Sequence, residues 1–255
     1  MKIVIKIGSS LVTSDSEIVD LTFLKTISDQ INKIKDTGHE VILVSSGAIA
    51  CGMKTWNLNN RPKEIEKLQA LSAVGQIGLI NAYQDELKKH GLFAAQVLLS
   101  HEDLKDPIRS INIKKSIKNI LSLGAIPIIN ENDSVSTEEI EFGDNDQLSG
   151  DLAKLICSEL LIILTDQDGV FDKNPATNQN AKLLSEIEFL DLDSLEIEFG
   201  NPGEYGRGGM KTKLLAAENY LNSENRMFIA NGKSKNILLD IISEKRVGTI
   251  IKLTN

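Results

Sequence analysis

Residues 2–10 read KIVIKIGSS, an apolar run of strand length that ends in a glycine and two serines. Alternation of such runs with helical patterns predicts a parallel sheet, and continuous apolar runs predict strands covered on both faces. We therefore predict an α/β fold, a three-layer α/β/α sandwich with a mostly parallel central sheet, formed as a single domain by residues 1–255. The other runs are EVILVS at 40–45, LFAAQVLL at 92–99, AIPII at 125–129, LLIIL at 160–164 and RMFIA at 226–230.

Apolar residues at helical spacing predict the connecting helices. One pattern covers residues 18–38, and a longer one covers residues 64–90. Another begins with Asp106 as N-cap and Pro107 as the first helical residue. Residues 172–208 are rich in turn-forming residues and are predicted to form loops over the sheet. The predicted buried stripe of the helix after Asp106 consists of Ile108, Ile111, Ile117 and Leu121.

The composition limits the class of partner. The chain has 255 residues and a formal net charge of −8, which argues against a nucleic acid or an anionic membrane as the main partner. Every apolar run falls short of the ~18 residues that a membrane span needs, so we expect a cytoplasmic protein. Cys51 and Cys157 have no zinc-like spacing and are expected to be buried thiols, so no metal-binding residues are predicted. His39, His90 and His101 lie in unrelated contexts and give no support to a catalytic triad.

Residues 126–146, IPIINENDSVSTEEIEFGDND, form an apolar run that ends in a cluster of acidic residues. Carboxylates gathered in a concave place are costly unless metal ions, ammonium groups or lysines offset them, and acids just past a strand end suggest a binding site. A solvated acidic loop is the alternative, and it is the commoner outcome for a charge run alone. The cluster comprises Glu131, Asp133, Glu138, Glu139, Glu141, Asp144 and Asp146.

The first two strand ends share a design. Lys6 comes just before Gly8 and two serines, and Ser46 comes just before Gly47 in SSGAIA. Neighbouring parallel strands place such loops on the same edge of a sheet, where a cation, hydroxyls and free backbone N–H groups suit a ligand. Each motif alone is compatible with an ordinary turn or with tight packing, but the pair favours a binding site.

Two later segments extend this edge. TDQDGVF at residues 165–171 offers a hydroxyl and carboxylates, which suit a sugar or a metal-bound phosphate but also fit a tight turn. GRGGMKTK at residues 206–213 places glycine amides before a helix, as in a phosphate cradle. Lys211 and Lys213 flank the apolar stripe of that helix on opposite sides, so spacing does not decide which one faces a ligand. The Walker A, HRD and DFG motifs are absent from the sequence, which excludes the usual nucleotide kinases and the protein kinases.

In chain order, IKIGSS, VSSGAIA, IPIINENDSV, FGDND, LTDQDGVF and GRGGMKTK resemble the motifs of the amino acid kinase family over nearly the whole chain. The resemblance implies an amino acid kinase-like fold. SSGAIA followed by INEND and GDND resembles the branch that acts on glutamate. This implies that ATP with Mg²⁺ phosphorylates the γ-carboxylate of L-glutamate, the first step of proline biosynthesis, and also implies feedback inhibition by proline and a homodimer or homotetramer.

The resemblance also implies roles for individual residues. Lys6 would contact the transferring phosphoryl group, Lys213 the leaving phosphates, and Asp146 would orient both lysines. Gly8 and Gly47 would lend backbone N–H groups. Glutamate would be bound by Ser46, Gly47, Asp133 (suited to the α-ammonium), Asp144 (suited to substrate or metal) and Asn145. The nucleotide would be bound by Lys6, Gly8, Thr165, Asp166, Gly208, Gly209, Met210, Thr212 and Lys213, while Lys211 would face solvent. The N-terminal half, about residues 1–150, would bind the amino acid, and residues 151–255 the nucleotide.

The chain departs from the family pattern in two places. It ends at Asn255 without the C-terminal PUA domain that many bacterial members carry, and it has Arg207 where the family usually has a small hydroxyl residue. Alternatives are another member of the family or a non-catalytic nucleotide-binding module on the same fold, although retention of Lys6 and Lys213 weighs against the module. A calcium- or magnesium-binding protein would need a DxDxDG loop, which the sequence lacks.

Overall fold

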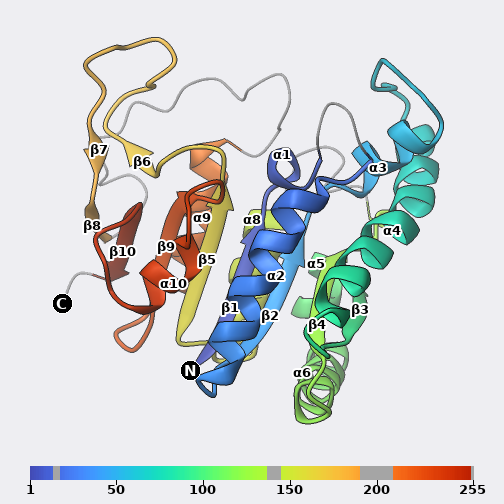
Figure 1. Ribbon diagram of the computed structural model, residues 1–255, viewed down its shortest axis with the longest axis horizontal. Coiled ribbons are helices and arrows are strands. Elements are labelled where there is room, and N and C mark those ends of the chain that lie inside the picture. Colours follow the sequence, from blue (N-terminus) through green and yellow to red (C-terminus); the bar gives the residue numbers. More distant parts are fainter. Residues whose placement is uncertain (14–17, 137–144, 190–208, 254–255) are drawn as a thin grey trace.

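The computed structural model describes residues 1–13, 18–136, 145–189 and 209–253 (Figure 1). Its main sheet has eight strands in the order β3-β4-β2-β1-β5-β9-β10-β8, and all neighbouring strands are parallel except β9 and β10. The predicted mostly parallel α/β sheet is confirmed. The strands are β1 (Lys2–Ile7), β2 (Glu40–Ser45), β3 (Ala94–Leu99), β4 (Ile126–Glu131), β5 (Leu160–Thr165), β8 (Glu186–Phe189), β9 (Arg226–Asn231) and β10 (Thr249–Leu253). A separate pair joins β6 (Val170–Phe171) to β7 (Leu183–Leu184).

Strand β1 lies in the interior of the sheet. It pairs with β2 on one side and β5 on the other, so that Lys6 is in register with Val44 and with Ile163. The carboxyl ends of these strands therefore lie together on one edge, at the top in Figure 1, which we call the strand-end edge. Open parallel sheets bind their ligands at this edge.

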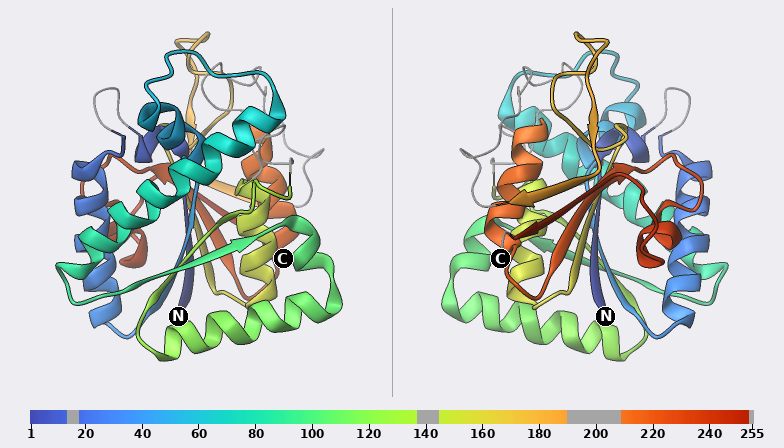
Figure 2. Two further views of the ribbon diagram at one scale, coloured as in Figure 1. Left: turned by 90° about the vertical axis from the view of Figure 1, so that its right-hand side faces the viewer. Right: turned by 90° about the vertical axis from the view of Figure 1, so that its left-hand side faces the viewer.

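Helices cover both faces of the sheet (Figure 2). Because side chains alternate along a strand, β1 sends Ile3, Ile5 and Ile7 into one core and Val4 into the other. The first core includes residues from α1 (Ser9–Val12), α2 (Leu21–Asp36), α3 (Ala48–Thr55), α4 (Ile65–Lys88) and α10 (Ile237–Ile242). The second includes residues from α6 (Pro107–Ser122), α8 (Asn145–Leu155) and α9 (Met210–Tyr220), and α5 (His101–Lys105) contacts α6 and α8.

Helix α6 begins as predicted but buries a different face. The Asp106 carboxylate accepts hydrogen bonds from the backbone N–H groups of Ile108 and Arg109, and Pro107 is the first helical residue. The predicted stripe is wrong at Ile108 and Ile111, which are 73% and 54% exposed, while Ile113 and Ile117 are buried. At ~100° per residue, Ile108 lies about 180° and Ile111 about 120° around the helix from Ile117, so the four predicted residues do not form one stripe.

Helices α3 and α4 cross at two glycines. A Cβ atom at Gly75 would lie 1.9 Å from the carbonyl oxygen of Ala48, and one at Gly52 would lie 1.9 Å from that of Leu71. Only glycine permits such an approach of two backbones. The crossing brings α4 against the helix that follows the Ser46-Gly47 turn.

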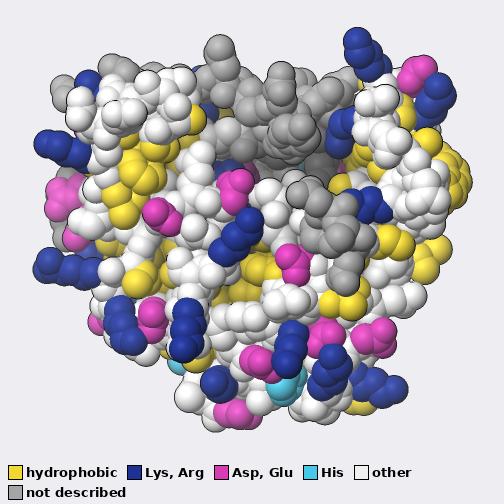
Figure 3. Space-filling model, turned by 45° about the horizontal axis from the view of Figure 1, so that its top comes forward, with side chains coloured by type: hydrophobic (Ala, Val, Ile, Leu, Met, Phe, Trp, Pro, Cys, Tyr) yellow, Lys and Arg dark blue, Asp and Glu magenta, His cyan; other side chains and the backbone are white. Residues whose placement is uncertain are grey.

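Cys51 is buried, as expected, but Cys157 is exposed in a turn after α8, with a positive φ of 52°. Among the described residues, no helix is long and apolar enough to cross a membrane. Figure 3 brings the strand-end side forward and shows side chains of both charges interspersed over the described surface.

Candidate active site

Two lysines from distant parts of the chain converge on one buried aspartate. Lys6 Nζ lies 2.6 Å from Asp146 Oδ1, and Lys213 Nζ lies 3.0 Å from Asp146 Oδ2. Asp146 is fully buried, and the two lysines are only 5% and 7% exposed. Strand β1 supplies Lys6, the first turn of α8 supplies Asp146, and α9 supplies Lys213. The structure thus brings together the three residues proposed as catalytic.

The packing of α8 against α9 explains how the aspartate reaches Lys213. A Cβ atom at Gly150 would lie 2.8 Å from the carbonyl oxygen of Ala216, so glycine allows the two helices to approach closely. Thr212 Oγ1 also donates to Asp146 Oδ2 at 2.8 Å. Lys211, on the same helix, is exposed, whereas Lys213 is buried against Asp146.

The protonation states follow from these contacts. Burial alone would raise the pKa of Asp146, but the charges and hydrogen bonds of Lys213 and Lys6 hold that pKa well below its usual range. Burial lowers the pKa of Lys213, and the negative charge of Asp146 opposes that change. Two lysines around one aspartate, each in its ordinary charged form, give the cluster a net charge of about +1 inside an acidic protein.

A second group of side chains surrounds Asn145, the residue before Asp146. Its Nδ2 donates to Ser45 O at 3.1 Å, Ser46 Oγ at 3.0 Å and Asn130 Oδ1 at 2.9 Å. Because Nδ2 makes all three contacts, Oδ1 points the other way, and this buried atom has no hydrogen-bond donor among the described residues. The site therefore presents an acceptor that a ligand donor can satisfy.

Asp133 presents a second such acceptor. It is buried beyond the end of β4, where its Oδ2 accepts a hydrogen bond from the Ser72 hydroxyl and its backbone oxygen accepts one from Gln69 Nε2 at 2.9 Å. Oδ1 is buried and has no donor in the described chain. Burial raises the pKa of Asp133 to about 6, although the Ser72 hydrogen bond and the charge of Arg61 act in the opposite direction. A carboxylate in this position gains from a cationic ligand.

The two predicted glycine turns differ. Gly47 has a φ of 109° and precedes α3, a backbone conformation that favours glycine. The Gly8 N–H donates to Leu164 O at 3.1 Å, so this N–H is engaged within the fold rather than offered to a ligand. That contact corrects the expectation that Gly8 lends its N–H group. Its lack of a side chain still matters, because a Cβ atom there would lie 3.3 Å from Leu164 O.

The predicted nucleotide residues lie around the ends of β5 and α9. Thr165 ends β5 and donates through Oγ1 to Asp166 Oδ1 at 3.2 Å, and Asp166 is exposed. Gly209 precedes α9, and Met210 is its first, partly buried residue. Asp144, Gly208, Arg207, Glu138, Glu139 and Glu141 lie outside the described residues.

The structure adds residues that the sequence did not single out. Asn130 Nδ2 donates to Gln76 Oε1 at 2.7 Å, which joins α4 to Asn145 through Asn130. Asn130 lay within the INEND motif, and Ser72 and Gln76 are buried polar residues four apart in an otherwise apolar helical pattern. The four-residue spacing of Ser72 and Gln76 was the signal that the sequence offered for a polar helix face, but it does not indicate which distant residues this face contacts.

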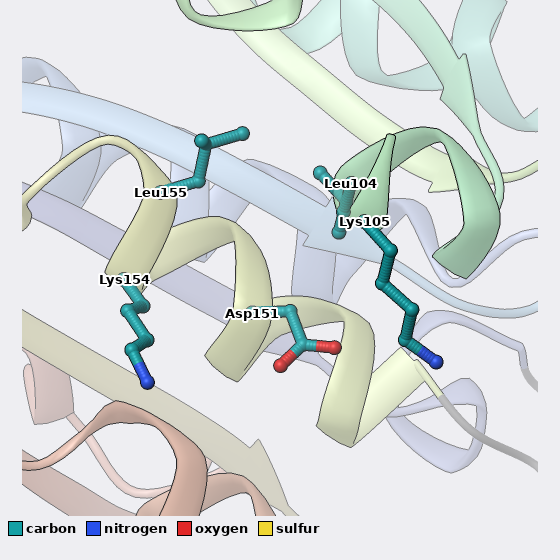
Figure 4. A pocket seen from close by; sticks show the side chains of 5 residues that line it. All are labelled: Leu104, Lys105, Asp151, Lys154 and Leu155. Carbon is teal, nitrogen blue, oxygen red and sulfur yellow. The ribbon is translucent and has the colours of Figure 1, made fainter. Parts of the chain in front are cut away.

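Two cavities are lined by side chains other than those of the candidate site. Figure 4 shows one of about 280 Å³ between α5 and α8, lined by Leu104, Lys105, Asp151, Lys154 and Leu155. Its side chains include none of the residues predicted for the site. A second, of about 430 Å³, includes Met1, Arg226 and Lys252 in its lining. Met1 directly precedes β1 and Arg226 begins β9, away from the strand-end edge.

The chain is similar in sequence to known proteins. The sequence model of the amino acid kinase family matches residues 1–231. A glutamate 5-kinase from Nitrosospira multiformis is 45% identical over 248 residues, covering 97% of this chain and 67% of that protein. One from Marinomonas sp. is 44% identical over 248 residues, covering 97% of this chain and 66% of its own length. The chain thus spans about two thirds of the length of these curated relatives.

Solved structures share the fold at low identity. An isopentenyl phosphate kinase from T. acidophilum is 18% identical with a TM-score of 0.64, covering 99% of this chain and 100% of that one. UMP kinase from Bacillus anthracis is 17% identical with a TM-score of 0.65, covering 98% and 95%. On the family match and the similarity of its relatives, the chain belongs to the amino acid kinase family.

Proposed function

We propose that the chain transfers the terminal phosphoryl group of ATP to the γ-carboxylate of L-glutamate, giving γ-glutamyl phosphate, the opening step of proline biosynthesis. The observation that carries the proposal is the convergence of Lys6 and Lys213 on buried Asp146. The high identity to glutamate 5-kinases supports the choice of substrate.

The positive charge of the cluster would offset the electrostatic repulsion between the two anionic reactants. A carboxylate and a phosphate brought to ~4 Å repel by about 4 kcal/mol at an effective dielectric near 20. Asp146 holds both ammonium groups in place, so that their positive charge is fixed at the strand-end edge. Fixed positive charge of this kind stabilises the transferring phosphoryl group without reorganisation during the reaction.

In the proposed step, a γ-carboxylate oxygen of glutamate attacks the terminal phosphorus. The bond from that phosphorus to the bridging oxygen breaks, and ADP leaves with the electron pair. The γ-carboxylate is already ionised at neutral pH, so no general base is required. Lys6 is proposed to follow the transferring group, while Lys213 neutralises charge on the leaving phosphates.

The buried acceptors favour an amino acid with a free ammonium group. Asp133 Oδ1 and Asn145 Oδ1 have no donors among the described residues, and an α-ammonium would supply N–H groups to both. Ser46, which contacts Asn145 at the end of β2, and Gly47 are proposed to complete the amino acid subsite, together with Asp144. An N-acetylated substrate would bring no positive charge to Asp133.

The nucleotide subsite is proposed on the C-terminal half, residues 151–255, with the N-terminal half, residues 1–150, binding the amino acid. The proposed nucleotide residues in the C-terminal half are Thr165, Asp166, Gly208, Gly209, Met210, Thr212 and Lys213, and the first strand end adds Lys6 and, through its lack of a side chain, Gly8. The described residues contain no cluster of three histidine, cysteine or acidic side chains that could hold a metal ion. Magnesium is proposed to enter as the Mg–ATP substrate complex. A homodimer or homotetramer and feedback inhibition by proline are proposed on the basis of resemblance, and a cytoplasmic location is proposed from the short apolar runs of the sequence.

Hydroxylamine trapping tests the reaction directly, because it converts an acyl phosphate into a hydroxamate. The purified chain is incubated with Mg–ATP, hydroxylamine and, in parallel, glutamate, aspartate, N-acetylglutamate or carbamate. ATP-dependent hydroxamate with glutamate as the preferred acceptor is expected. Preference for N-acetylglutamate would contradict the role of Asp133, and ATP binding without transfer to any acceptor would favour a non-catalytic nucleotide-binding module.

A further inference from the structure

Helix α4 presents a buried polar face to the amino acid subsite. Gln69, Ser72 and Gln76 are three and four residues apart, so they lie on one side of the helix. Ser72 and Gln76 are 4% and 8% exposed. The α3–α4 glycine crossing fixes this helix close to the strand-end edge (Figure 1).

At one end of this face, α4 holds Asp133 at two points. Gln69 binds its backbone oxygen and Ser72 binds its carboxylate, so both the main chain and the side chain are restrained. The Ser72 hydroxyl occupies Oδ2, which leaves Oδ1 as the acceptor for a ligand.

At the other end of this face, Gln76 of α4 is hydrogen-bonded to the side-chain amide of Asn130, which is hydrogen-bonded in turn to that of Asn145. Gln76 Oε1 accepts from Asn130 Nδ2, which turns Asn130 Oδ1 toward Asn145 Nδ2. The backbone N–H of Glu131 donates to the same Asn130 oxygen at 2.9 Å. The carbonyl oxygen of Ser45, which can only accept, agrees with this orientation of Asn145. Without Gln76, Asn130 Nδ2 loses this acceptor, and the Glu131 N–H becomes the remaining restraint among the described residues on the direction of the Asn130 amide.

We propose that Ser72 and Gln76 are positioning residues for the amino acid substrate: through Asp133 and Asn130–Asn145 they aim two buried oxygen acceptors at its ammonium group. This inference rests on the proposed function. Neither residue is proposed to touch the substrate, so their loss should weaken amino acid binding and leave the chemical step and nucleotide binding largely intact.

The test compares Ser72→Ala and Gln76→Met with matched buried residues on α2. Ser28→Ala removes a serine that is 1% exposed, and Gln30→Met removes a glutamine that is 3% exposed and binds the backbone of Leu238. Circular dichroism and thermal unfolding verify that each variant is folded. The KM for glutamate, the KM for ATP and kcat are measured for every variant in the hydroxamate assay.

Each site variant is expected to raise the KM for glutamate roughly tenfold, with kcat and the KM for ATP changed less than about threefold. The α2 variants should lower only thermal stability. Ser72→Ala should also move the acid limb of kcat/KM for glutamate to higher pH, because Asp133 loses a donor that favours its ionised form while Arg61 remains. Ser72→Thr, which keeps a hydroxyl, should return this limb toward that of the wild type.

Two failures are distinguishable. A wild-type protein with no glutamate-dependent hydroxamate would overturn the proposed function and this inference with it. An active wild type, together with folded Ser72→Ala and Gln76→Met variants whose KM for glutamate and pH profile are unchanged, would overturn the positioning role alone. Equal effects from the α2 variants would also overturn it, because they would show that general loss of stability accounts for the change.

Discussion

Replacing Lys213 by methionine isolates the contribution of one buried charge. Methionine keeps an unbranched side chain of similar length but removes the ammonium group. In the native site two lysines surround one aspartate, so the cluster changes from a net charge of about +1 to about 0. Asp146 remains paired with Lys6 at 2.6 Å and with Thr212 at 2.8 Å, so no buried carboxylate is left without a partner.

The magnitude follows from Coulomb's law. One unit charge ~4 Å from a phosphate oxygen is worth about 4 kcal/mol at an effective dielectric near 20. At about 1.4 kcal/mol per tenfold in rate, kcat should fall about a thousandfold. Because Lys213 is proposed to act on the leaving phosphates, the KM for glutamate should change less than about threefold.

The assay is steady-state hydroxamate formation at saturating Mg–ATP, with thermal unfolding to verify the fold. Lys211→Met is the matched control, since Lys211 lies on the same helix but is exposed, and its kcat should stay within about twofold of the wild type. A folded Lys213→Met protein that keeps more than about a tenth of the wild-type kcat would refute the charge argument. Equal losses in kcat and glutamate affinity would refute the assignment to the nucleotide side.

Three further predictions concern the amino acid subsite and the helix crossing. Asp133→Ala should raise the KM for glutamate by roughly tenfold to a hundredfold with kcat less affected, measured in the same assay; an unchanged KM would contradict its pairing with the ammonium group. The ionised form of Asp133 is the one that binds a cation, so kcat/KM for glutamate should fall as pH drops below about 6 in the wild type. A pH profile without this inflection would count against the assignment. Gly75→Ala should destabilise the fold by about 1–3 kcal/mol or more, since the added methyl would meet Ala48 O at 1.9 Å. Gly78→Ala, on the same helix with no atom within 4 Å, should instead stabilise it by about 0.5–1 kcal/mol, and similar melting temperatures for the two variants would contradict the close crossing.

The sequence predicted the strands of the sheet interior well, because they are long apolar runs that both helical layers cover. The predicted run at residues 160–164 became β5, Leu160–Thr165, and that at 226–230 became β9, Arg226–Asn231. Strands β8 and β10 were not predicted, because β8 has only four residues and both alternate between buried and more exposed positions near the end of the sheet. Their pairing depends on partners that local pattern does not identify.

Residues of the candidate site could be chosen from the sequence wherever a strand end carried a distinctive residue, as at Lys6 and Ser46. They could not be chosen where function depends on the direction of a side chain. Periodicity placed Lys211 and Lys213 on opposite flanks of one helix, and only the packing of α9 against α8 selects Lys213. The contribution of Ser72 and Gln76 was likewise hidden, because a polar residue within a helix does not indicate which distant strand it meets.

The interior position of β1 has a consequence for how the chain is made. Ile3 and its partner Leu160 on β5 are 157 residues apart, so the first strand pairs on that side only after most of the chain has been synthesised. At ~5–20 residues per second, the ribosome needs roughly 10–30 s to supply this partner. During that interval the nascent strand leaves one row of backbone hydrogen-bonding groups without its final partner, which makes it a natural client for chaperones.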